Sequence, residues 1–592
     1  DGVPLFVEEL TRAWLEAGSQ TPGSEIPPTL RDALRARLDR VVTARETAGW
    51  AAALGREFAY PVLVAVAPYS EERLQVDLAA LVQAGLIRPT VPEGQGLYTF
   101  RHALIQETAH AALLKTERQT YHRRIAETYA AAFPRIAETR PELLAEHFSL
   151  GGLPAQAADY WLQAGERATA QGATTEARAF FEGALASIDA QDHGRRWRAL
   201  KGREAVFFLA GERTAEQADL AAMLKLAQAC NNPMWRAETL QCRLRYLNAV
   251  GDYASILSLA DEAIAAARAA GSQGLEARAL SSKAAAQTRL SDPTAHQTAE
   301  EALALAQAAG EDWATAFATG MIALHKAYGG DYARAAQLWA CVLALVRQGG
   351  DRALESRALS NLGAAYQYLG LFEEAQQYLK AGMALCDLIG DRHSHAYNVV
   401  NLGGVKLLSG DLPAARQLFD QALHEATAVD DASLAAGVLW ELGALAERAG
   451  DYGEAAQRLL EARRTYVQLG MVARVMETDA LLAKCALGQG RPEEARHAAG
   501  QVWRYLQEHG ATAMDEAVST YLTLANVFQA LAPSTQGQGE DPTGRAIIEV
   551  GQALLMARAA QISDPLWRRP FLENVPANRE MMRRWRAIQE VA

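Results

Sequence analysis

Cysteine and aromatic residues are scarce in this sequence, which has five cysteines among 592 residues and only 7% aromatic residues. No Cys-x-x-Cys spacing pairs the cysteines, which favours reduced packing residues over a disulfide framework or a zinc site. The longest apolar run, AYPVLVAVA at 59–67, is far shorter than the ~20 residues that a membrane span needs. No secretion signal is present. We therefore expect a cytoplasmic protein with no membrane partner.

The chain also lacks an excess of positive charge and the common catalytic motifs. The net charge of -12 argues against a general nucleic-acid binder, because neutralising phosphates requires a basic surface. The chain contains no Gly-Lys-Ser or Gly-Lys-Thr string of a phosphate-binding loop and no Gly-x-Ser-x-Gly nucleophile motif. These absences predict that the chain by itself is not an enzyme and that it holds neither a metal nor a cofactor.

A repeat dominates what is present. Residues 361–375 read NLGAAYQYLGLFEEA, residues 401–415 read NLGGVKLLSGDLPAA, and nine such segments follow one another at intervals of 39 or 40 residues. In each unit a helix-periodic stretch ends at a glycine, which suits a left-handed C-cap. A second stretch then begins with the acidic or proline residues typical of a helix N-terminus. The pattern predicts an all-α array of α-hairpins that bury their apolar faces by stacking on their neighbours.

The repeat resembles the tetratricopeptide repeat. The family pattern Leu-Gly-x-x-Tyr, followed by an alanine in the second helix, is matched in three successive units: by Leu362, Gly363, Tyr366 and Ala375, by Leu402, Gly403 and Ala415, and by Leu442, Gly443 and Ala455. The usual period of that family is ~34 residues, so we expect helices about one turn longer here. We interpret the small residues as packing positions that let the two helices of a hairpin approach each other.

The first 160 residues do not follow the repeat. Helical patterns from Leu30, near 44–55, near 61–67 and at 70–87 precede the alternating segment IRPTVPEGQGLYTF at 87–100, which reads as a two-stranded hairpin around a glycine turn. Helices followed by a hairpin are the order of a winged helix. We predict these segments: 1–25, the end of an ATPase helical region; 26–120, a winged helix; 121–162, a helical connector; 163–531, repeats; 532–544, a loop; and 545–592, a last helix and a C-terminal cap.

Several segments of this front part resemble the end of the ATPase module in bacterial STAND proteins, which are signal-transduction ATPases. They include GVPLFVEEL, LRDALRARLDR, LVQAGLI and YTFRHALIQETAHAALL, and the later segments ELLAEHFSLGGLPAQAADYWLQAGERA and FLENVPANREMMRRW are similar to that group too. The resemblance implies that Gly2 and Pro4 belong to a Gly-x-Pro motif at an adenine pocket. It also implies that His102 faces the phosphate of bound ADP. Because the chain begins at Asp1, we expect it to be a fragment whose parent binds ADP or ATP in an N-terminal domain.

Three functions remain open at this stage. The first is the regulatory part of a STAND ATPase, in which the winged helix controls the nucleotide state and the repeats bind an activating protein or peptide. The second is a free-standing repeat scaffold without nucleotide control. The third, a winged-helix DNA-binding regulator, is disfavoured because the segment SEERLQVDLAALVQA places Glu71, Glu72 and Asp77 against a single arginine.

The tetratricopeptide resemblance also selects residues of a concave face. In such arrays the exposed inner positions lie six and three residues before the small residue of the first helix, and one, four and five residues after it. Applied to the units registered on Ala323, Gly363, Gly403 and Gly443, this rule selects aromatic residues and arginines, the types that dominate binding energy at interfaces. The predicted partner-binding residues are Phe317, Tyr328, Arg357, Tyr368, Tyr397, Trp440 and Arg448.

Overall fold

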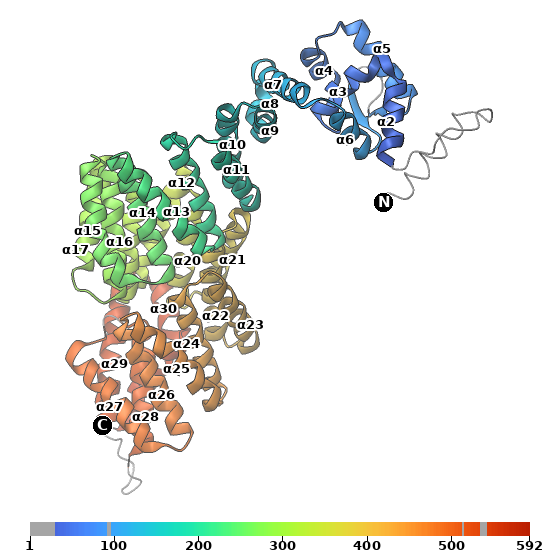
Figure 1. Ribbon diagram of the computed structural model, residues 1–592. Helices are drawn as coiled ribbons and strands as arrows, with labels where there is room; N and C mark the ends of the chain where they lie inside the picture. Colours follow the sequence, from blue (N-terminus) through green and yellow to red (C-terminus); the bar gives the residue numbers. More distant parts are fainter. Residues whose placement is uncertain (1–29, 91–95, 512–513, 533–541, 592) are drawn as a thin grey trace. The chain divides into compact units, whose positions relative to one another are not determined.

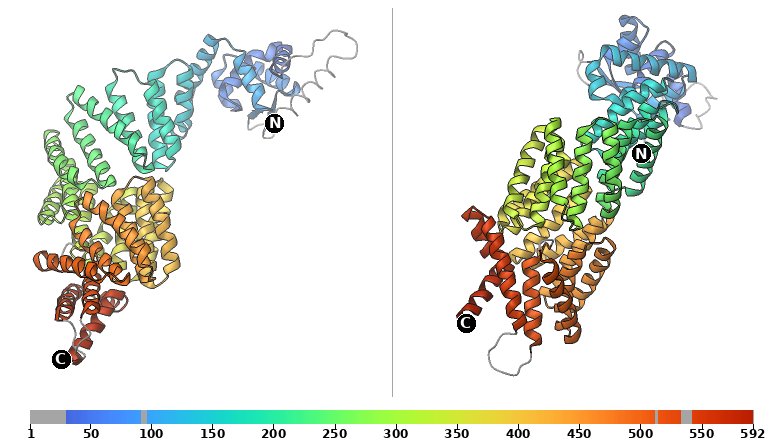
Figure 2. Two further views of the ribbon diagram at one scale, coloured as in Figure 1. Left: turned by 60° about the horizontal axis from the view of Figure 1, so that its bottom comes forward. Right: turned by 90° about the vertical axis from the view of Figure 1, so that its left-hand side faces the viewer.

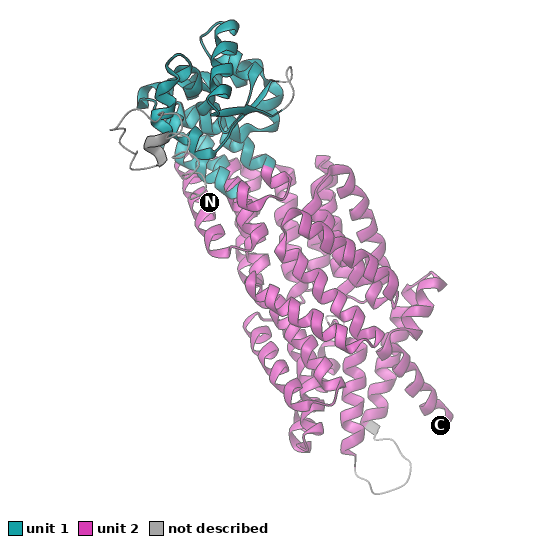
Figure 3. Ribbon diagram, turned by 90° about the vertical axis from the view of Figure 1, so that its right-hand side faces the viewer, with its two compact units in different colours: residues 1–167, 177–199 teal, residues 168–176, 200–592 magenta. Residues whose placement is uncertain are grey.

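The computed structural model describes residues 30–90, 96–511, 514–532 and 542–591. It divides into two compact units, the first made of residues 1–167 and 177–199 and the second of residues 168–176 and 200–592 (Figure 3). Among the described residues, the three strands all lie in the first unit, and every other regular element is helical (Figure 1). None of the helices described has the length and apolar character needed to cross a bilayer.

The first unit combines short helices with a small antiparallel sheet of order β1-β3-β2. Phe58 pairs with Tyr98 and Arg88 with Thr99, so β3 is the central strand. The predicted hairpin is therefore present, but the sequence reading missed the third strand, β1. The elements in chain order are α2 (Leu30–Arg40), η1 (Val42–Ala44), α3 (Arg45–Leu54), β1 (Glu57–Ala59), α4 (Tyr60–Val66), α5 (Glu71–Gln83), β2 (Ile87–Pro89), β3 (Leu97–Phe100), α6 (Ala103–Ala111), α7 (Lys115–Ala132), α8 (Pro134–Thr139) and α9 (Pro141–Leu150).

The rest of the chain alternates between first and second helices of successive hairpins, as the repeat predicts. The first helices are α10 (Pro154–Ala170), α12 (His193–Ala210), α14 (Pro233–Val250), α16 (Gln273–Arg289), α18 (Asp312–Tyr328), α20 (Arg352–Tyr368), α22 (Arg392–Ser409), α24 (Ala432–Arg448), α26 (Val472–Gly488) and α28 (Ala517–Leu531). The second helices are α11 (Thr174–Ser187), α13 (Arg213–Ala229), α15 (Tyr253–Ala269), α17 (Ala295–Ala309), α19 (Tyr332–Gly349), α21 (Phe372–Ile389), α23 (Leu412–Ala428), α25 (Tyr452–Gln468), α27 (Pro492–His509) and α29 (Pro542–Gln561). The chain ends with α30 (Pro565–Glu573) and α31 (Pro576–Val591), and α31 packs on α28, α29 and α30.

The helix ends follow the predicted chemistry. Gly330, Gly370 and Gly410 close first helices in the left-handed conformation, with φ of +82°, +75° and +90°. Asp430 takes the same conformation at the end of α23, with φ of +55°, which explains why an acidic residue can replace glycine at this position. Asp side chains cap several of the helices that follow, as Asp431 does by accepting a hydrogen bond of 2.8 Å from the amide of Leu434.

The hairpins coil so that the first helices lie on the inner side. Consecutive helices from α13 to α29 pack against each other, and the first helices from α14 to α28 also contact the first helix of the next hairpin (Figure 2). The small residues permit the close approach within a hairpin, because a Cβ atom added to Gly363 or Gly443 would lie only 2.6 Å from Leu379 or 2.7 Å from Leu459. These glycines are therefore packing residues, as the sequence reading interpreted them.

Successive turns of the array touch each other. Four hydrogen bonds join residues that are between 180 and 216 positions apart, which corresponds to about five hairpins of 40 residues for each turn of the superhelix. Arg213 Nε donates to the carbonyl of Val429 at 3.1 Å, and the Tyr253 hydroxyl to Ser433 Oγ at 3.3 Å. Further along, the Tyr332 hydroxyl bonds to the carbonyl of Asp515, and Asn574 Nδ2 to the carbonyl of Gly370. Each turn of the array is consequently flanked by the next one.

We predict that Gly403→Ala destabilises the array by about 1–3 kcal/mol. The new Cβ atom would lie 2.6 Å from the Phe419 ring, so the variant would be overpacked inside this hairpin. Urea unfolding followed by circular dichroism measures the effect. Gly500→Ala is the matched control, since Gly500 lies inside α27 with no atom within 4 Å of an added Cβ. It should be stabilising by about 0.5–1 kcal/mol. Equal effects of the two substitutions would contradict the packing role of Gly403.

Candidate functional site

The second unit has a cavity of about 160 Å³ on the inner side of the array. First helices supply most of its wall, and the rest comes from Tyr466 of α25, from Met471 just before α26 and from the segment that precedes α28. Its aromatic lining consists of Tyr368, Tyr397, Trp440 and Tyr466. Its charged lining consists of Arg289, Glu441, Arg474, Asp515 and Glu516. Three of the seven residues that the repeat rule selects, Tyr368, Tyr397 and Trp440, thus lie together in one cavity.

Arg474 organises one side of this cavity. Its guanidinium forms ion pairs of 2.6 Å with Glu477 and 3.4 Å with Asp515. It also donates a hydrogen bond of 3.1 Å to the Tyr466 hydroxyl and lies 4.9 Å from the centre of the Trp440 ring. Because a buried guanidinium needs partners for its charge and its N–H groups, this set of contacts holds Arg474 in place. The charge of Arg474 is therefore already matched.

Two carboxyl groups beside Arg474 have no such partner. Among the described residues, neither Glu441 nor Glu516 forms a side-chain hydrogen bond or an ion pair. Burial, reinforced by the carboxylates of Glu441, Glu477 and Asp515, raises the pKa of Glu516 to about 8. Burial also raises the pKa of Glu441 and of Glu477, although Arg474 opposes it in both cases. The cavity thus contains more acidic groups than its arginines neutralise.

Three arginines elsewhere on the inner face have aromatic rather than acidic neighbours. Arg278 lies 3.9 Å from the centre of the Trp313 ring, Arg289 lies 5.3 Å from that of Tyr328, and Arg357 lies 5.7 Å from that of Phe317. Within the described part of the chain, none of the three guanidinium groups forms an ion pair, and Nε of Arg278 is buried without a hydrogen-bond partner. Burial lowers the pKa of Arg278 and Arg357.

The structure separates the remaining predicted residues. Phe317 and Tyr328 lie beside inner arginines rather than in the cavity, whereas Arg448 is exposed at the end of α24 and donates to the carbonyl of Leu407 at 3.3 Å. His102, in the first unit, is the half-buried N-cap residue of α6, and its side chain makes no capping hydrogen bond. Gly2 and Pro4 lie outside the described residues.

Trp440 belongs both to the cavity and to the core. Its side chain lines the cavity but is only 7% exposed and packs in a cluster with Leu439, Tyr466 and Val475. Truncating it to alanine would therefore cost about 3–5 kcal/mol of stability in addition to any effect on binding. This burial corrects the prediction that Trp440 is an exposed groove residue. Phenylalanine is the substitution that keeps an aromatic ring at this position.

Several residues around the inner face were not predicted from the sequence, although some of them carried a signal. Applied one hairpin earlier, to Ala284 of α16, the same rule selects Arg278 and Arg289. Asp515 and Glu516 gave no such signal, because they precede α28 outside the regular helix spacing. They reach the cavity because α28 packs on α26, which brings Asp515 within 3.4 Å of Arg474.

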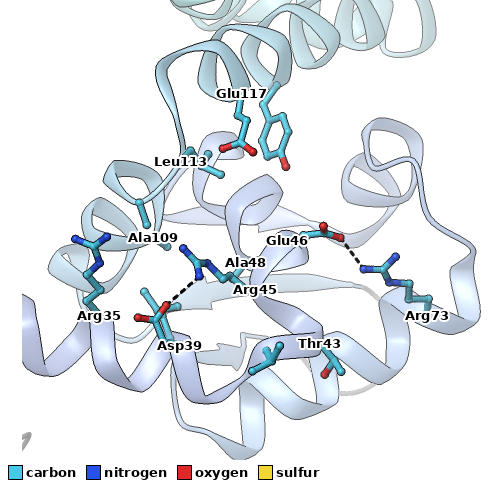
Figure 4. A pocket seen from close by; sticks show the side chains of 14 residues that line it. Arg35, Asp39, Thr43, Arg45, Glu46, Ala48, Arg73, Ala109, Leu113 and Glu117 are labelled. Atoms are coloured by element: carbon cyan, nitrogen blue, oxygen red, sulfur yellow. Dashed lines mark hydrogen bonds and ion pairs between the residues drawn. The ribbon is translucent and has the colours of Figure 1, made fainter.

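A larger cavity of about 460 Å³ lies in the first unit, between α2, α3, α5, α6 and α7 (Figure 4). Its arginines are largely neutralised: Arg45 pairs with Asp39 at 3.2 Å, and Arg73 pairs with Glu46 at 2.8 Å. Its walls are open, with Val42 75% exposed. Since these charges already have partners, this cavity is a weaker candidate than the interior of the array. Among the residues described, no group of three or more His, Cys, Asp or Glu side chains is placed to hold a metal ion.

Sequence similarity to a curated protein covers about a third of this chain. No family model matches it. An uncharacterized protein of Rhizobium meliloti (strain 1021) is 32% identical over 193 residues, which cover 31% of this chain. The match spans about a fifth, 19%, of the length of that curated relative.

Among solved structures, the chain is similar to several helical proteins at low sequence identity. A Rap protein complexed with competence and sporulation factor has a TM-score of 0.45 at 13% identity, over 60% of this chain and 99% of that one. The Cut9–Hcn1 hetero-tetramer of the APC/C has a TM-score of 0.44 at 10% identity, over 96% and 99%. A STAND protein with a tetratricopeptide repeat sensor from Pyrococcus horikoshii has a TM-score of 0.37 at 12% identity, over 85% and 73%.

The raised pKa of Glu516 predicts how stability depends on pH. In the folded protein this carboxyl keeps its proton up to about pH 8, whereas an unfolded glutamate loses it near pH ~4.3. The folded state therefore binds more protons between these values, so stability is highest at the acidic end and falls as the pH rises through 8. Glu516→Gln cannot ionise and should reduce the loss in thermal midpoint from about pH 5 to about pH 9.

Thermal unfolding followed by circular dichroism at several pH values measures this effect. Glu461→Gln, on the exposed side of α25, is the control and should follow the parent chain. Parallel curves for Glu516→Gln and the parent would show that Glu516 is ionised throughout and is not crowded by its neighbours.

Proposed function

We propose that this chain is the regulatory part of a STAND signalling ATPase of a cytoplasmic bacterial type. In this proposal the array binds an activating protein or peptide on its inner face, and the first unit is a winged helix that controls the nucleotide state of an N-terminal ADP- or ATP-binding domain. The chain itself performs no catalysis. The quoted segments that resemble STAND proteins support the regulatory role.

The observation that carries the binding role is the set of unmatched charges inside the array. Among the residues that the structure describes, Arg278, Arg289 and Arg357 have no carboxylate in ion-pair contact, and Glu441 and Glu516 have no arginine or lysine in ion-pair contact. Charged groups that are withdrawn from water without a partner are costly. A bound protein or peptide segment with groups of both signs would supply the missing partners, which a purely structural array does not require.

A DNA-binding role is less compatible with the first unit. The single arginine of α5, Arg73, is engaged with Glu46, and the buried Asp77 accepts a hydrogen bond of 2.6 Å from Thr47. The exposed side of α5 therefore offers the acidic Glu71 and Glu72, which repel phosphates. A free-standing scaffold remains the alternative function. It differs from the proposal in having no nucleotide-binding domain, which the coding sequence upstream of Asp1 would reveal as a Gly-Lys-Ser or Gly-Lys-Thr loop.

We predict that His102 restrains the parent protein. Its imidazole makes no capping bond to α6 and is therefore available to hydrogen-bond an ADP phosphate. In the full-length protein His102→Ala should lose co-purifying ADP, and its basal ATP turnover should rise by about tenfold, equivalent to one hydrogen bond of about 1.4 kcal/mol to a charged group. Chromatography of the nucleotide released on denaturation and a phosphate-release assay measure the two effects.

His497→Ala is the control, since His497 is exposed on α27. It should retain ADP and basal turnover at parental levels. Normal ADP content and turnover in a folded His102→Ala variant would leave His102 with a structural role only.

We predict that Arg357→Ala weakens binding of the activator by roughly 1–2 kcal/mol or more, because arginines in desolvated grooves are frequent hot spots. The activator is the purified protein or peptide that raises ATP turnover of the full-length protein. Titration calorimetry measures its binding. Arg352→Ala, on the exposed first turn of α20, should bind like the parent. Equal binding by both variants would move the binding surface away from the inner face.

A further inference from the structure

Two arginines from different first helices lie against one pair of aromatic rings on α18. Trp313 and Phe317 stack with their ring centres 5.2 Å apart. The guanidinium of Arg278, on α16, lies 3.9 Å from the centre of the Trp313 ring, and that of Arg357, on α20, lies 5.7 Å from the centre of the Phe317 ring. Both α16 and α20 pack on α18. We call these four residues the arginine site.

The donors of the arginine site have no acceptor. A guanidinium contacts an aromatic ring through its face, so its N–H groups remain in the plane and free to bond. Among the described residues, no group accepts a hydrogen bond from the side chain of Arg278 or Arg357, and Nε of Arg278 is buried without a partner. Buried donors normally have an acceptor, so this one indicates a missing acceptor group.

The carboxylates around Arg357 are engaged elsewhere. Asp351 caps α20 by accepting from the amide of Leu354 at 2.9 Å, and it also accepts from Trp313 Nε1 at 2.5 Å. Asp391 caps α22 by accepting from the amide of Ser394 at 2.9 Å. Neither carboxylate lies within ion-pair distance of Arg357. The protein therefore places acidic groups near this arginine but uses them to end helices.

The carboxylates around Arg278 leave its charge unmatched too. Glu238 pairs with Lys201 at 3.0 Å, and Glu311 is exposed at the start of α18. Arg245 of α14 adds a third guanidinium to this region, and its charge is matched by Glu204 at 2.7 Å. Burial lowers the pKa of both arginines of the site, and the charge of Arg245 acts in the same direction. Two positive charges thus remain without a counter-charge among the described residues.

We propose that the arginine site binds an acidic segment of the protein or peptide held by the array, with aspartate or glutamate carboxylates accepting hydrogen bonds from Arg278 and Arg357. Carboxylate oxygens match the fork of N–H donors on a guanidinium. The proposal rests on the proposed function, since it names the group by which the bound partner is recognised. A basic segment is repelled here, and a neutral one leaves both guanidinium groups without a counter-charge.

The test compares acetyl-Ala-Glu-Ala-Glu-Ala-amide with the peptide that has glutamine in place of both glutamates. Indole ¹⁵N–¹H spectra of the full chain follow the Trp313 signal, which Trp313→Phe identifies by its disappearance. The glutamate peptide should shift this signal at millimolar concentration and bind at least about tenfold more tightly than the glutamine peptide, as expected for desolvated charge pairs. Its affinity should fall as salt rises from about 0.05 M to about 0.5 M, because salt screens the attraction.

A phosphoserine peptide distinguishes the source of the oxyanion, because a phosphoryl group offers the same acceptor oxygens. It carries phosphoserine in place of both glutamates. Affinity within about tenfold of the glutamate peptide supports a site for carboxylates. A much higher affinity, with the glutamate peptide no better than its glutamine analogue, would overturn that assignment in favour of a phosphorylated partner.

Protein variants provide the complementary arm. Arg278→Gln and Arg357→Gln should each weaken the glutamate peptide by about tenfold or more and leave the glutamine peptide unaffected. Arg352→Gln, on the exposed first turn of α20, is the matched control and should bind like the parent.

Thermal midpoints separate a binding role from a structural one. Arg278→Met and Arg357→Met keep most of the side-chain volume and remove a charge without a counter-charge, so the midpoint should stay or rise. Arg203→Met should lower it, because the buried Asp219, now 2.7 Å from Arg203, would lose its cation. A loss in both inner variants as large as that of Arg203→Met would show that these arginines serve the fold, and would overturn the site.

The outcomes separate this proposal from the proposed function. Equal affinity for the glutamate and glutamine peptides, or no effect of either Arg→Gln variant, would overturn acidic recognition. An activator whose binding is weakened by Arg357→Ala would still support the proposed function in that case. Conversely, acidic peptides bound at the arginine site, with an activator that binds outside the array, would retain the site and reject the proposed function.

Discussion

The contact between one turn of the array and the next is the constraint on which the interior depends. A single α-hairpin leaves one apolar face uncovered and must stack on its neighbours. Here successive turns of the superhelix, each of about five hairpins, also contact each other. Hydrogen bonds from Arg213 to Val429 and from Tyr253 to Ser433 join them. The inner face thereby loses the open solvent of a shallow groove. Charged groups on the inner face lie in surroundings of low polarity, which shift their pKa values.

Two ion pairs elsewhere in the array contrast with the unmatched inner charges. Arg203 meets Asp219 in a two-pronged contact of 2.7 and 2.8 Å, and Arg463 meets Asp479 in the same way at 2.6 and 3.1 Å. Both pairs join neighbouring helices and need no ligand. Glu516 is instead surrounded by other carboxyl groups. Burial and these neighbours raise its pKa to about 8, so its proton stays bound at neutral pH. This contrast is the basis of our proposal that the inner face binds a partner.

Much of the fold followed from local signals in the sequence. Glycine positions and acidic N-caps recur every 40 residues, so the helix ends at Gly330, Gly370 and Gly410 could be read directly. The strand at Glu57–Ala59 was missed because three residues give no reliable alternation. His393 and His395 lie in the first turn of α22 and bond to Asp431 and Glu425 at 3.0 and 2.8 Å, contacts between helices that no local pattern predicts.

The candidate site was less predictable than the fold, for a physical reason. The position rule of the repeat found Tyr368, Tyr397 and Trp440, since each lies on a first helix. It could not find Asp515 and Glu516, because they precede α28 and lie outside the helix positions to which the rule applies. They meet Arg474 through the packing of α28 on α26, whereas their position beside Arg289 depends on the pitch of the superhelix. That pitch accumulates from small rotations at many interfaces and has no local sequence signal.

The most direct test of the account is an experimental structure of the full-length protein with its activator bound. The account predicts ligand density inside the array, with atoms of the ligand within hydrogen-bond distance of the Glu516 carboxyl group and of the Arg357 guanidinium. An activator bound only to the outer helices, with an interior that contains no ligand, would contradict it.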